Sequence, residues 1–225
     1  MAEPMIALAV LDMAGTTVTD DGLVLRAFDA AATAVGMAES GAEREAARRY
    51  VVDTMGRSKI EVFRALLADE DRAQRANAAF ESAYDRFIAE GVAPVPGAAE
   101  AIGELRSAGV KVALTTGFSP ATQARILDAL GWTDIADLTL APDTGVRGRP
   151  YPDLVLTAVL RVGIDDVRHV AVAGDTASDI ETGLRAGASI ATGVLTGAHD
   201  EQTLRAAGAT HVLESVADLP RLVLR

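Results

Sequence analysis

Residues 6–17 read IALAVLDMAGTT, a short apolar run that ends abruptly at Asp12 and continues into the turn-like Gly15-Thr16-Thr17. A continuous apolar run bounded by turn residues is typical of a buried strand in a parallel sheet. The run from Ile6 to Leu11 therefore predicts the first strand of such a sheet. Asp12 then lies at the strand's carboxyl end, beside a turn whose backbone N–H groups can face an anion.

Length and composition limit the class of protein. With 225 residues, 49% of them hydrophobic and 24% charged, the chain is long enough for one α/β domain with a small inserted module. The formal net charge of -11 argues against a nucleic-acid partner, because nucleic acids are bound through dense basic surfaces. Cysteine is absent, which excludes disulfides and thiolate chemistry.

The hydropathy pattern contains no secretion signal and no run approaching the ~20 apolar residues of a transmembrane helix. We therefore expect a cytoplasmic protein without a membrane partner. A reducing compartment agrees with the lack of cysteine.

The domain organisation follows from two changes in the pattern. From about Gly22 to Gly91 the chain is helical in pattern, with no convincing strand, and residues 92–97 (VAPVPG) interrupt the helical periodicity. Beyond this linker, apolar strands at 112–115, 138–140, 170–173 and 190–194 alternate with helical stretches. This alternation predicts a Rossmann-like, doubly wound α/β fold with a parallel sheet covered on both faces. We assign residues 1–17 and 94–225 to the core and residues 18–93 to a small helical domain inserted after the first strand.

Two more acidic residues lie where a strand gives way to a helix, in Gly174-Asp175-Thr176-Ala177-Ser178-Asp179. Taken alone, Asp175 and Asp179 fit ordinary helix capping. Placed in one crevice with Asp12, three carboxylates would repel each other unless a hard divalent cation neutralised them. The combination predicts a magnesium site.

Two further segments offer groups for a phosphoryl oxygen. Thr115-Thr116-Gly117 follows an apolar strand and supplies a hydroxyl and backbone N–H groups before the next helix. Arg149 lies between Gly148 and Pro150 on a stiff loop that can direct a guanidinium at an anion. In isolation the first is also a common helix cap and the second an ordinary surface arginine.

These four segments, in this order and each at a predicted strand end, resemble the signature motifs of the haloacid dehalogenase superfamily. The resemblance implies Asp12 as a covalent nucleophile on phosphorus, and Thr116 and Arg149 as ligands of the phosphoryl oxygens. It also implies that the helical insert is a cap that closes over the substrate and excludes water. The implied magnesium ligands are Asp12, the Ala14 carbonyl, Asp175 and Asp179.

Ala14 departs from the usual pattern of the superfamily that the chain resembles, in which most phosphatases carry an acid–base aspartate two residues after the nucleophile. The segment from Asp12 to Val18 instead resembles the first motif of phosphonoacetaldehyde hydrolase, a subgroup that cleaves a carbon–phosphorus bond and normally has alanine there. Residues 55–61 (MGRSKIE) resemble that subgroup's Schiff-base lysine segment. The subgroup thereby implies Lys59 as a catalytic residue, and the residues that it implies at the substrate are Gly15, Thr16, Met55, Gly56, Arg57 and Gly117.

A lysine at residue 59 is informative because only Lys59 and Lys111 are lysines among the 21 basic residues. An imine between Lys59 and a substrate aldehyde would act as an electron sink, which an arginine cannot provide. A solvated or phosphate-pairing lysine remains the alternative for Lys59. Three residues differ from the subgroup's usual pattern: Met13 replaces a tryptophan, Val62 a histidine and Asp153 an aromatic residue.

The sequence therefore predicts a hydrolase of a small anionic phosphorylated or phosphonate substrate, with phosphonoacetaldehyde as the leading specific candidate. A phosphomonoester phosphatase of the same superfamily is the alternative, followed by a non-catalytic phosphate-binding module. Because relatives in the subgroup are often dimers through their caps, the resemblance also extends to a homodimer.

Overall fold

The computed structural model describes residues 6–224, so residues 1–5 and 225 of the predicted core lie outside the described range. Six parallel strands form one sheet in the order β3-β2-β1-β4-β5-β6. This order, which reverses direction at β1, confirms the predicted doubly wound α/β fold. The strands are β1 (Leu8–Asp12), β2 (Lys111–Thr115), β3 (Leu138–Leu140), β4 (Val170–Gly174), β5 (Ile190–Val194) and β6 (His211–Leu213).

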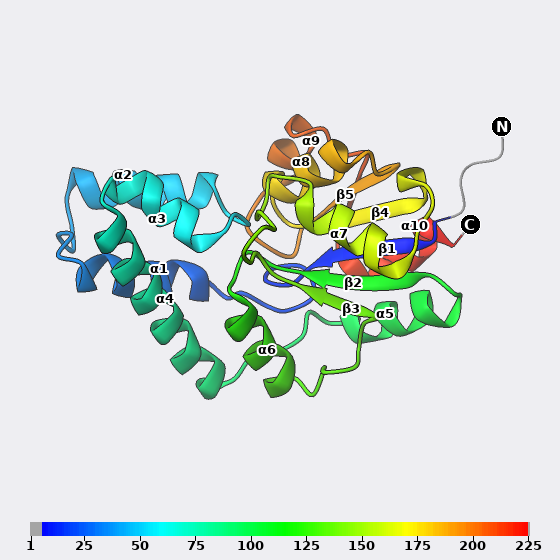
Figure 1. Ribbon diagram of the computed structural model, residues 1–225, viewed down its shortest axis with the longest axis horizontal. Coiled ribbons are helices and arrows are strands. Elements are labelled where there is room, and N and C mark those ends of the chain that lie inside the picture. The colour runs from blue at the N-terminus through cyan, green and yellow to red at the C-terminus, as the bar shows by residue number, and fades with distance from the viewer. Residues whose placement is uncertain (1–5, 225) are drawn as a thin grey trace.

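Helices cover both faces of the sheet, as Figure 1 shows. These helices are α5 (Ala98–Ser107), α6 (Pro120–Ala129), α7 (Asp153–Val162), α8 (Ala177–Ala186), α9 (Glu201–Ala206) and α10 (Leu219–Val223), with short 3-10 turns at Val167–His169 and Val216–Asp218. Successive side chains in a strand point to opposite faces. Leu8 and Val10 of β1 therefore pack with α7 and α8, whereas Ala9 and Leu11 pack with α5 and α10. All positions of β1 and β4 are buried.

The remaining helices form a separate group beside the carboxyl ends of the strands (Figure 1). They are α1 (Leu23–Ala34), α2 (Ala42–Asp53), α3 (Lys59–Leu67) and α4 (Glu70–Glu90). The chain leaves the sheet and returns to it along two adjacent segments, where Thr19 N donates to Ala93 O at 2.9 Å and Val95 N donates to Thr17 O at 3.0 Å. The helical segment thus begins and ends beside the turn that follows Asp12.

An aromatic cluster connects this helical group to the sheet. Phe118, which follows β2, lies with its ring centroid 4.5 Å from that of Tyr84 and 6.2 Å from that of Phe80. Phe80 in turn packs edge-on against Phe63, and Phe63 stacks on Phe28. Aromatic pairs of this kind add about 0.5–1.5 kcal/mol beyond their buried area. The helices α1, α3 and α4 are therefore held against the strand ends by side-chain packing as well as by the two connecting segments.

The element bounds differ from the sequence-based expectations mainly at the edges. β1 begins at Leu8, two residues later than predicted, and α8 begins at Ala177, because Thr176 caps it. The strand β6 and the helices α9 and α10 were not predicted. Each is only three to six residues long, too short for a periodic pattern to stand out.

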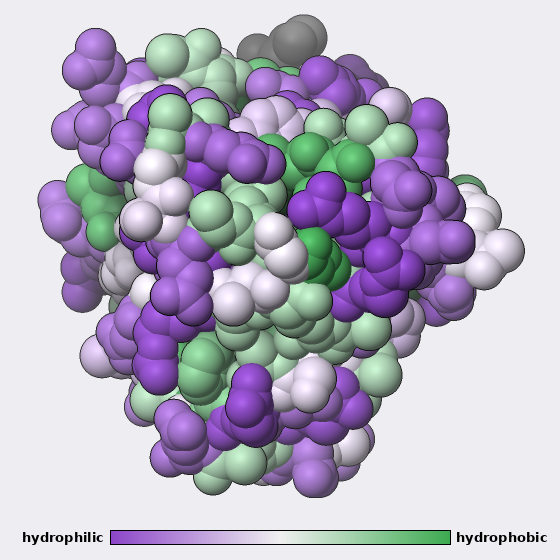
Figure 2. Space-filling model, turned by 90° about the vertical axis from the view of Figure 1, so that its left-hand side faces the viewer, coloured by the Kyte–Doolittle hydropathy of each residue, from purple (hydrophilic) through white to green (hydrophobic). Residues whose placement is uncertain are grey.

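Figure 2 views the end of the molecule formed by the helical group, where strongly hydrophobic residues are scattered among hydrophilic ones. The predicted homodimer stays a prediction, because scattered apolar residues are normal on any surface. Within residues 6–224, no helix has the length and apolar character needed to cross a bilayer.

Candidate active site

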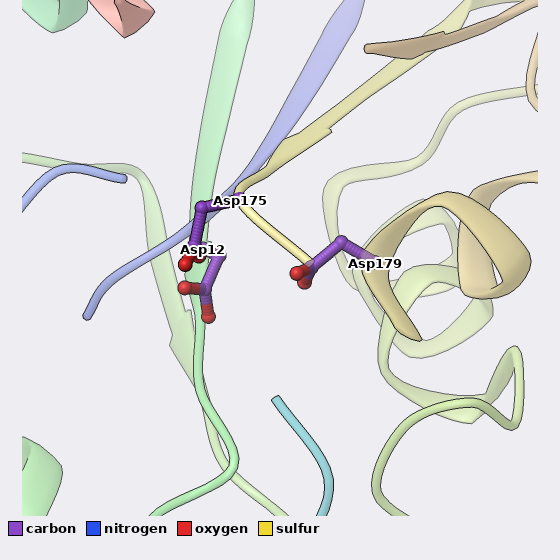
Figure 3. A group of neighbouring side chains, drawn as sticks. All are labelled: Asp12, Asp175 and Asp179. Atoms are coloured by element: carbon purple, nitrogen blue, oxygen red, sulfur yellow. The ribbon is translucent and has the colours of Figure 1, made fainter. Parts of the chain in front are cut away.

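Three aspartates from distant parts of the chain converge at the carboxyl ends of the central strands. Asp12 ends β1, Asp175 follows β4, and Asp179 lies in the first turn of α8. Figure 3 shows Asp179 pointing from its helix toward the other two carboxylates. Each contributes an oxygen to a group whose members all lie within 4.8 Å of one another, and all three side chains are buried. The convergence that the motif spacing predicts is therefore present.

The turn from β4 into α8 positions Asp179. Thr176 caps the helix, and its backbone N–H donates to Asp179 Oδ2 at 3.1 Å, so the carboxylate is fixed by the capping box itself. A Cβ at Gly174 would lie only 2.2 Å from Asp179 Cγ. The close approach of this carboxylate to the end of β4 thus requires glycine.

Asp175 is held by two segments far from it in sequence. Thr16 Oγ1 donates to Asp175 Oδ1 at 3.2 Å, and the Ala198 N–H donates to Asp175 Oδ2 at 2.7 Å. A Cβ at Gly197 would come within 2.0 Å of that same oxygen. The loop after β5 therefore approaches this carboxylate as closely as its backbone allows.

Arg149 links two of the three aspartates, Asp12 and Asp179. Its Nη2 donates to Asp12 Oδ1 at 2.5 Å, and its Nε lies 2.9 Å from Asp179 Oδ1. The guanidinium also donates through Nη1 to the Gly56 carbonyl at 3.0 Å, although residue 56 belongs to the loop between α2 and α3. One buried side chain thus connects the helical group with the carboxylate cluster.

The charges of this cluster do not balance. When all three buried carboxyls are ionised, three negative charges face the one positive charge of the guanidinium, which leaves a surplus of two negative charges. Burial raises the pKa of Asp12 well above its usual value, against the opposing effect of Arg149. Burial together with Asp179 raises the pKa of Asp175 to about 7. Oxygen ligands with surplus negative charge are suited to a hard divalent cation, so the residues fit such an ion.

Lys59 opens the helix α3 and faces the same small cavity as Asp12, which has a volume of about 30 Å³. Its backbone N–H donates to Gly117 O at 3.4 Å, and its Nζ lies 5.4 Å from the ring centroid of Phe118. Burial lowers the pKa of Lys59 to about 8, partly offset by the negative charge of Asp20. A lysine with this pKa is neutral in a substantial fraction of molecules near pH 8.

The other predicted site residues divide into three groups. Ala14, Met55, Gly56, Thr116 and Gly117 line the cavity with Asp12 and Lys59. Thr16 and Gly15 instead lie against Asp175. Thr16 donates a hydrogen bond from its hydroxyl to Asp175 Oδ1. At Gly15 the approach is so close that an added Cβ would lie 2.5 Å from Asp175 Oδ2. Arg57 faces a separate, larger groove beside Tyr151. Their substrate and metal contacts stay predictions.

Sequence reasoning missed several residues at the cavity. Asp20, Phe118, Thr176 and Ala198 also line it. Thr176 was within reach, because it comes directly after Asp175 at the carboxyl end of the predicted strand 170–173, and this end lies at the same sheet edge as Asp12. Asp20 carries no such signal, because it comes after the turn and before a helix.

The sequence model of the haloacid dehalogenase-like hydrolase family matches residues 6–187, which is most of the chain. The chain belongs to this family. As a haloacid dehalogenase-like hydrolase, it carries the acidic cluster of Asp12, Asp175 and Asp179 that can hold the divalent metal.

Curated relatives of this hydrolase include phosphonoacetaldehyde hydrolases. The enzyme of Pseudomonas paraeruginosa is 38% identical over 113 residues, which cover 46% of this chain and 41% of the relative. That of Pseudomonas fluorescens is 34% identical over 151 residues, or 59% of this chain and 54% of the relative. The chain thus spans about half the length of the curated relatives it matches.

Solved structures match almost the whole of this haloacid dehalogenase-like hydrolase. A phosphonoacetaldehyde hydrolase-like protein from Oleispira antarctica is 26% identical with a TM-score of 0.84, covering 99% of this chain and 92% of that one. A putative phosphoglycolate phosphatase from Lactobacillus delbrueckii subsp. bulgaricus is 19% identical with a TM-score of 0.80, covering 97% and 98%. The second likeness shows the shared fold alone.

Proposed function

We propose that this hydrolase cleaves the carbon–phosphorus bond of phosphonoacetaldehyde or a closely related phosphonate, with Asp12 as the nucleophile and Lys59 as an imine-forming residue. The observation that carries the proposal is that Lys59 and Asp12 share one small cavity in which burial lowers the pKa of the amine to about 8. The relatives named as phosphonoacetaldehyde hydrolases support the same substrate, although they match only part of the chain.

The carboxylate cluster accounts for the phosphoryl half of the reaction. Asp12 attacks phosphorus and becomes an aspartyl phosphate, which water then hydrolyses. Arg149, already 2.5 Å from Asp12, and Thr116, which lines the cavity, are the residues we assign to the phosphoryl oxygens. We propose Mg²⁺ as the divalent ion, held by Asp12, the Ala14 carbonyl, Asp175 and Asp179. When bound, it would neutralise charge on these carboxylates and on the phosphoryl group.

Lys59 accounts for the leaving group. The neutral amine adds to the aldehyde carbon, and loss of water gives an imine that carries a positive charge when protonated. As the carbon–phosphorus bond breaks, its electron pair moves into that iminium and forms an enamine. The enamine then takes a proton from water at carbon, and hydrolysis of the resulting iminium releases acetaldehyde and the free Lys59 amine. This route needs no carboxyl at residue 14 to protonate a leaving oxygen, which agrees with Ala14 at that position.

The helical group formed by residues 18–93 is, in this proposal, a cap that closes the cavity. It contributes Lys59 and the Gly56 carbonyl, which accepts a hydrogen bond from Arg149. Closing the cap therefore brings the imine-forming residue and the nucleophile together and keeps bulk water out.

A phosphomonoester phosphatase is the second candidate, and one contact favours it. Lys59 Nζ lies 5.4 Å from the ring centroid of Phe118 and 6.0 Å from that of Phe80. Aromatic faces stabilise the protonated ammonium, and a charged Lys59 would bind a phosphate ester instead of forming an imine.

The test is magnesium-dependent turnover of phosphonoacetaldehyde, measured beside a panel of phosphate monoesters, with borohydride added to trap any imine. We expect acetaldehyde and phosphate as products, and a reduced adduct on the peptide that contains Lys59. Lys59→Arg keeps the charge and should lose both turnover and adduct. Lys111→Arg is the matched control, because Lys111 is the other lysine of the chain. It is exposed at the amino end of β2, whereas the active site lies at the carboxyl ends of the strands. Turnover of phosphate esters alone, without an adduct, would favour the phosphatase instead.

A further inference from the structure

Asp20 is an ionisable residue of the cavity to which the mechanism above gives no role. The cavity is lined by five ionisable side chains: Asp12, Asp20, Lys59, Arg149 and Asp175. Asp12 and Asp175 belong to the carboxylate cluster, and Arg149 is ion-paired within it. This leaves Asp20 as the carboxyl group of the cavity that is free of the cluster.

Among the described residues that line the cavity, every carboxyl group other than that of Asp20 belongs to the acidic cluster of the metal site. Residue 14 is alanine and has no carboxyl group. Val62, one turn after Lys59 on α3, is apolar, buried in the hydrophobic core and not part of the cavity lining. Imine formation and hydrolysis both move protons, so a positioned residue that donates and accepts them accelerates both steps.

The chain geometry before α1 directs Asp20 inward. Asp21 and Gly22 both have left-handed backbone conformations, with φ of 45° and 75°, which turn the chain sharply into the helix. Asp20 Oδ1 accepts a hydrogen bond from the Val24 N–H at 3.2 Å, and Asp20 O accepts one from Leu23 N at 2.7 Å. The carboxyl group is therefore fixed against the first turn of α1, where Val24 also lines the cavity.

The electrostatic surroundings agree with this position. Burial raises the pKa of Asp20, opposed by the Val24 N–H and by the charge of Lys59, with a small contribution from the like charge of Asp21. Asp20 in turn raises the pKa of Lys59. Burial, followed by the charges of Asp20 and Asp12, also raises the pKa of the Tyr84 phenol. Asp20 is thus electrostatically coupled to the amine that the proposed function uses.

We infer that Asp20 is the acid–base residue for imine chemistry at Lys59, donating a proton to the hydroxyl that departs as the imine forms and recovering it from the water that later hydrolyses the imine. The inference rests on the proposed function, because it presupposes that Lys59 condenses with an aldehyde.

Each step balances in atoms and charge. In the forward step, the C–O bond of the carbinolamine breaks while the nitrogen lone pair forms the C=N bond. The departing hydroxyl takes the proton of the Asp20 carboxylic acid and leaves as water, so the products are an iminium and the Asp20 carboxylate. In the reverse step, water adds to the iminium carbon, its proton returns to Asp20, and the C=N electron pair returns to nitrogen.

The experiment uses the full chain and acetaldehyde, the product that carbon–phosphorus cleavage would release, so that no reaction at Asp12 is needed. The time course of borohydride-trapped adduct on Lys59 is followed by mass spectrometry in the parent, Asp20→Asn and Asp21→Asn. Asparagine keeps an oxygen to accept the hydrogen bond from Val24, so the variant removes the acid while preserving the start of α1. Asp21 is the matched control, an exposed neighbouring carboxylate.

We expect Asp21→Asn to trap adduct at the parent rate, and Asp20→Asn to do so at least about 10²-fold more slowly, as for loss of a positioned acid. Asp20→Glu should recover part of the rate, which a purely structural role would not predict. Trapping at the parent rate in Asp20→Asn would overturn the role of Asp20 while leaving the proposed function intact. A parent protein that traps no adduct at Lys59 would overturn the proposed function itself.

Discussion

Replacing Asp179 by asparagine should weaken divalent-metal binding severely while leaving the fold in place. The side chain is buried, and its oxygen belongs to the group of three carboxylates whose members lie within 4.8 Å of one another. Asparagine still offers an oxygen to the Thr176 N–H that caps α8. The substitution therefore removes one negative charge from the metal site without removing the cap.

The size of the effect follows from the charges. Two unit charges 4.8 Å apart interact by about 3 kcal/mol at an effective dielectric constant of about 20. A divalent ion interacts about twice as strongly with each carboxylate, so about 3 kcal/mol is a conservative loss. This corresponds to magnesium binding at least about 10²-fold weaker, since 1.4 kcal/mol is a factor of about ten.

We would measure the free energy of unfolding of the protein by heat and by denaturant, with and without magnesium, and the magnesium Kd by calorimetry. At a magnesium concentration about 100 times the parent Kd, bound metal stabilises the parent by about 2.7 kcal/mol. A 10²-fold weaker site would gain only about 0.4 kcal/mol at that concentration. Asp165→Asn is the control, because Asp165 is an exposed acid outside the cluster. Equal magnesium stabilisation of the Asp179→Asn variant and the parent would refute the metal site.

Three further results are expected from the same site. Magnesium affinity should fall as pH drops through about 7, because the pKa of Asp175 is raised to about 7 and its proton must leave before the ion binds. Isothermal titration calorimetry from pH 6 to 8 measures the affinity, and an affinity that does not change with pH would contradict this role of Asp175. In the Asp20→Asn variant, which has no titrating acid at residue 20, the rate of borohydride trapping at Lys59 should rise with pH and level off by about pH 8, because only the neutral amine attacks an aldehyde. A rate in this variant that falls with rising pH would contradict the low pKa of Lys59. Gly56→Ala should lower the free energy of unfolding more than Gly36→Ala. Both glycines have a left-handed φ, but only at Gly56 would the new Cβ lie 2.5 Å from Thr176 Oγ1. Denaturant unfolding of both variants measures the difference, and equal losses of stability would mean that the contact at Gly56 relaxes freely.

Much of the site could be predicted from the sequence because a parallel sheet brings the carboxyl ends of its strands to one edge. Asp12 and Asp175 each follow an apolar strand, so their proximity follows once the strands are recognised. The capping pattern places Asp179 in the first turn of the next helix. These positions depend on local sequence and on the topology of the sheet alone.

The remaining features depend on contacts between segments distant in sequence. Arg149 was predicted to meet a phosphoryl group, but its simultaneous pairing with Asp12 and Asp179 depends on the exact path of its loop. The Ala198 N–H reaches Asp175 from the loop after β5, a position that no periodic pattern specifies. Asp20 is similar, because its entry into the cavity depends on the left-handed turn before α1.

Attack by Asp12 on phosphorus is tested most directly by identifying the residue that is phosphorylated during turnover. The protein is mixed with magnesium and phosphonoacetaldehyde, quenched in acid within a single turnover, and digested for peptide mass mapping. We expect a phosphoryl group on Asp12, and none anywhere in the Asp12→Asn variant, which should be inactive. Steady turnover without phosphate on Asp12, or full activity of Asp12→Asn, would contradict it.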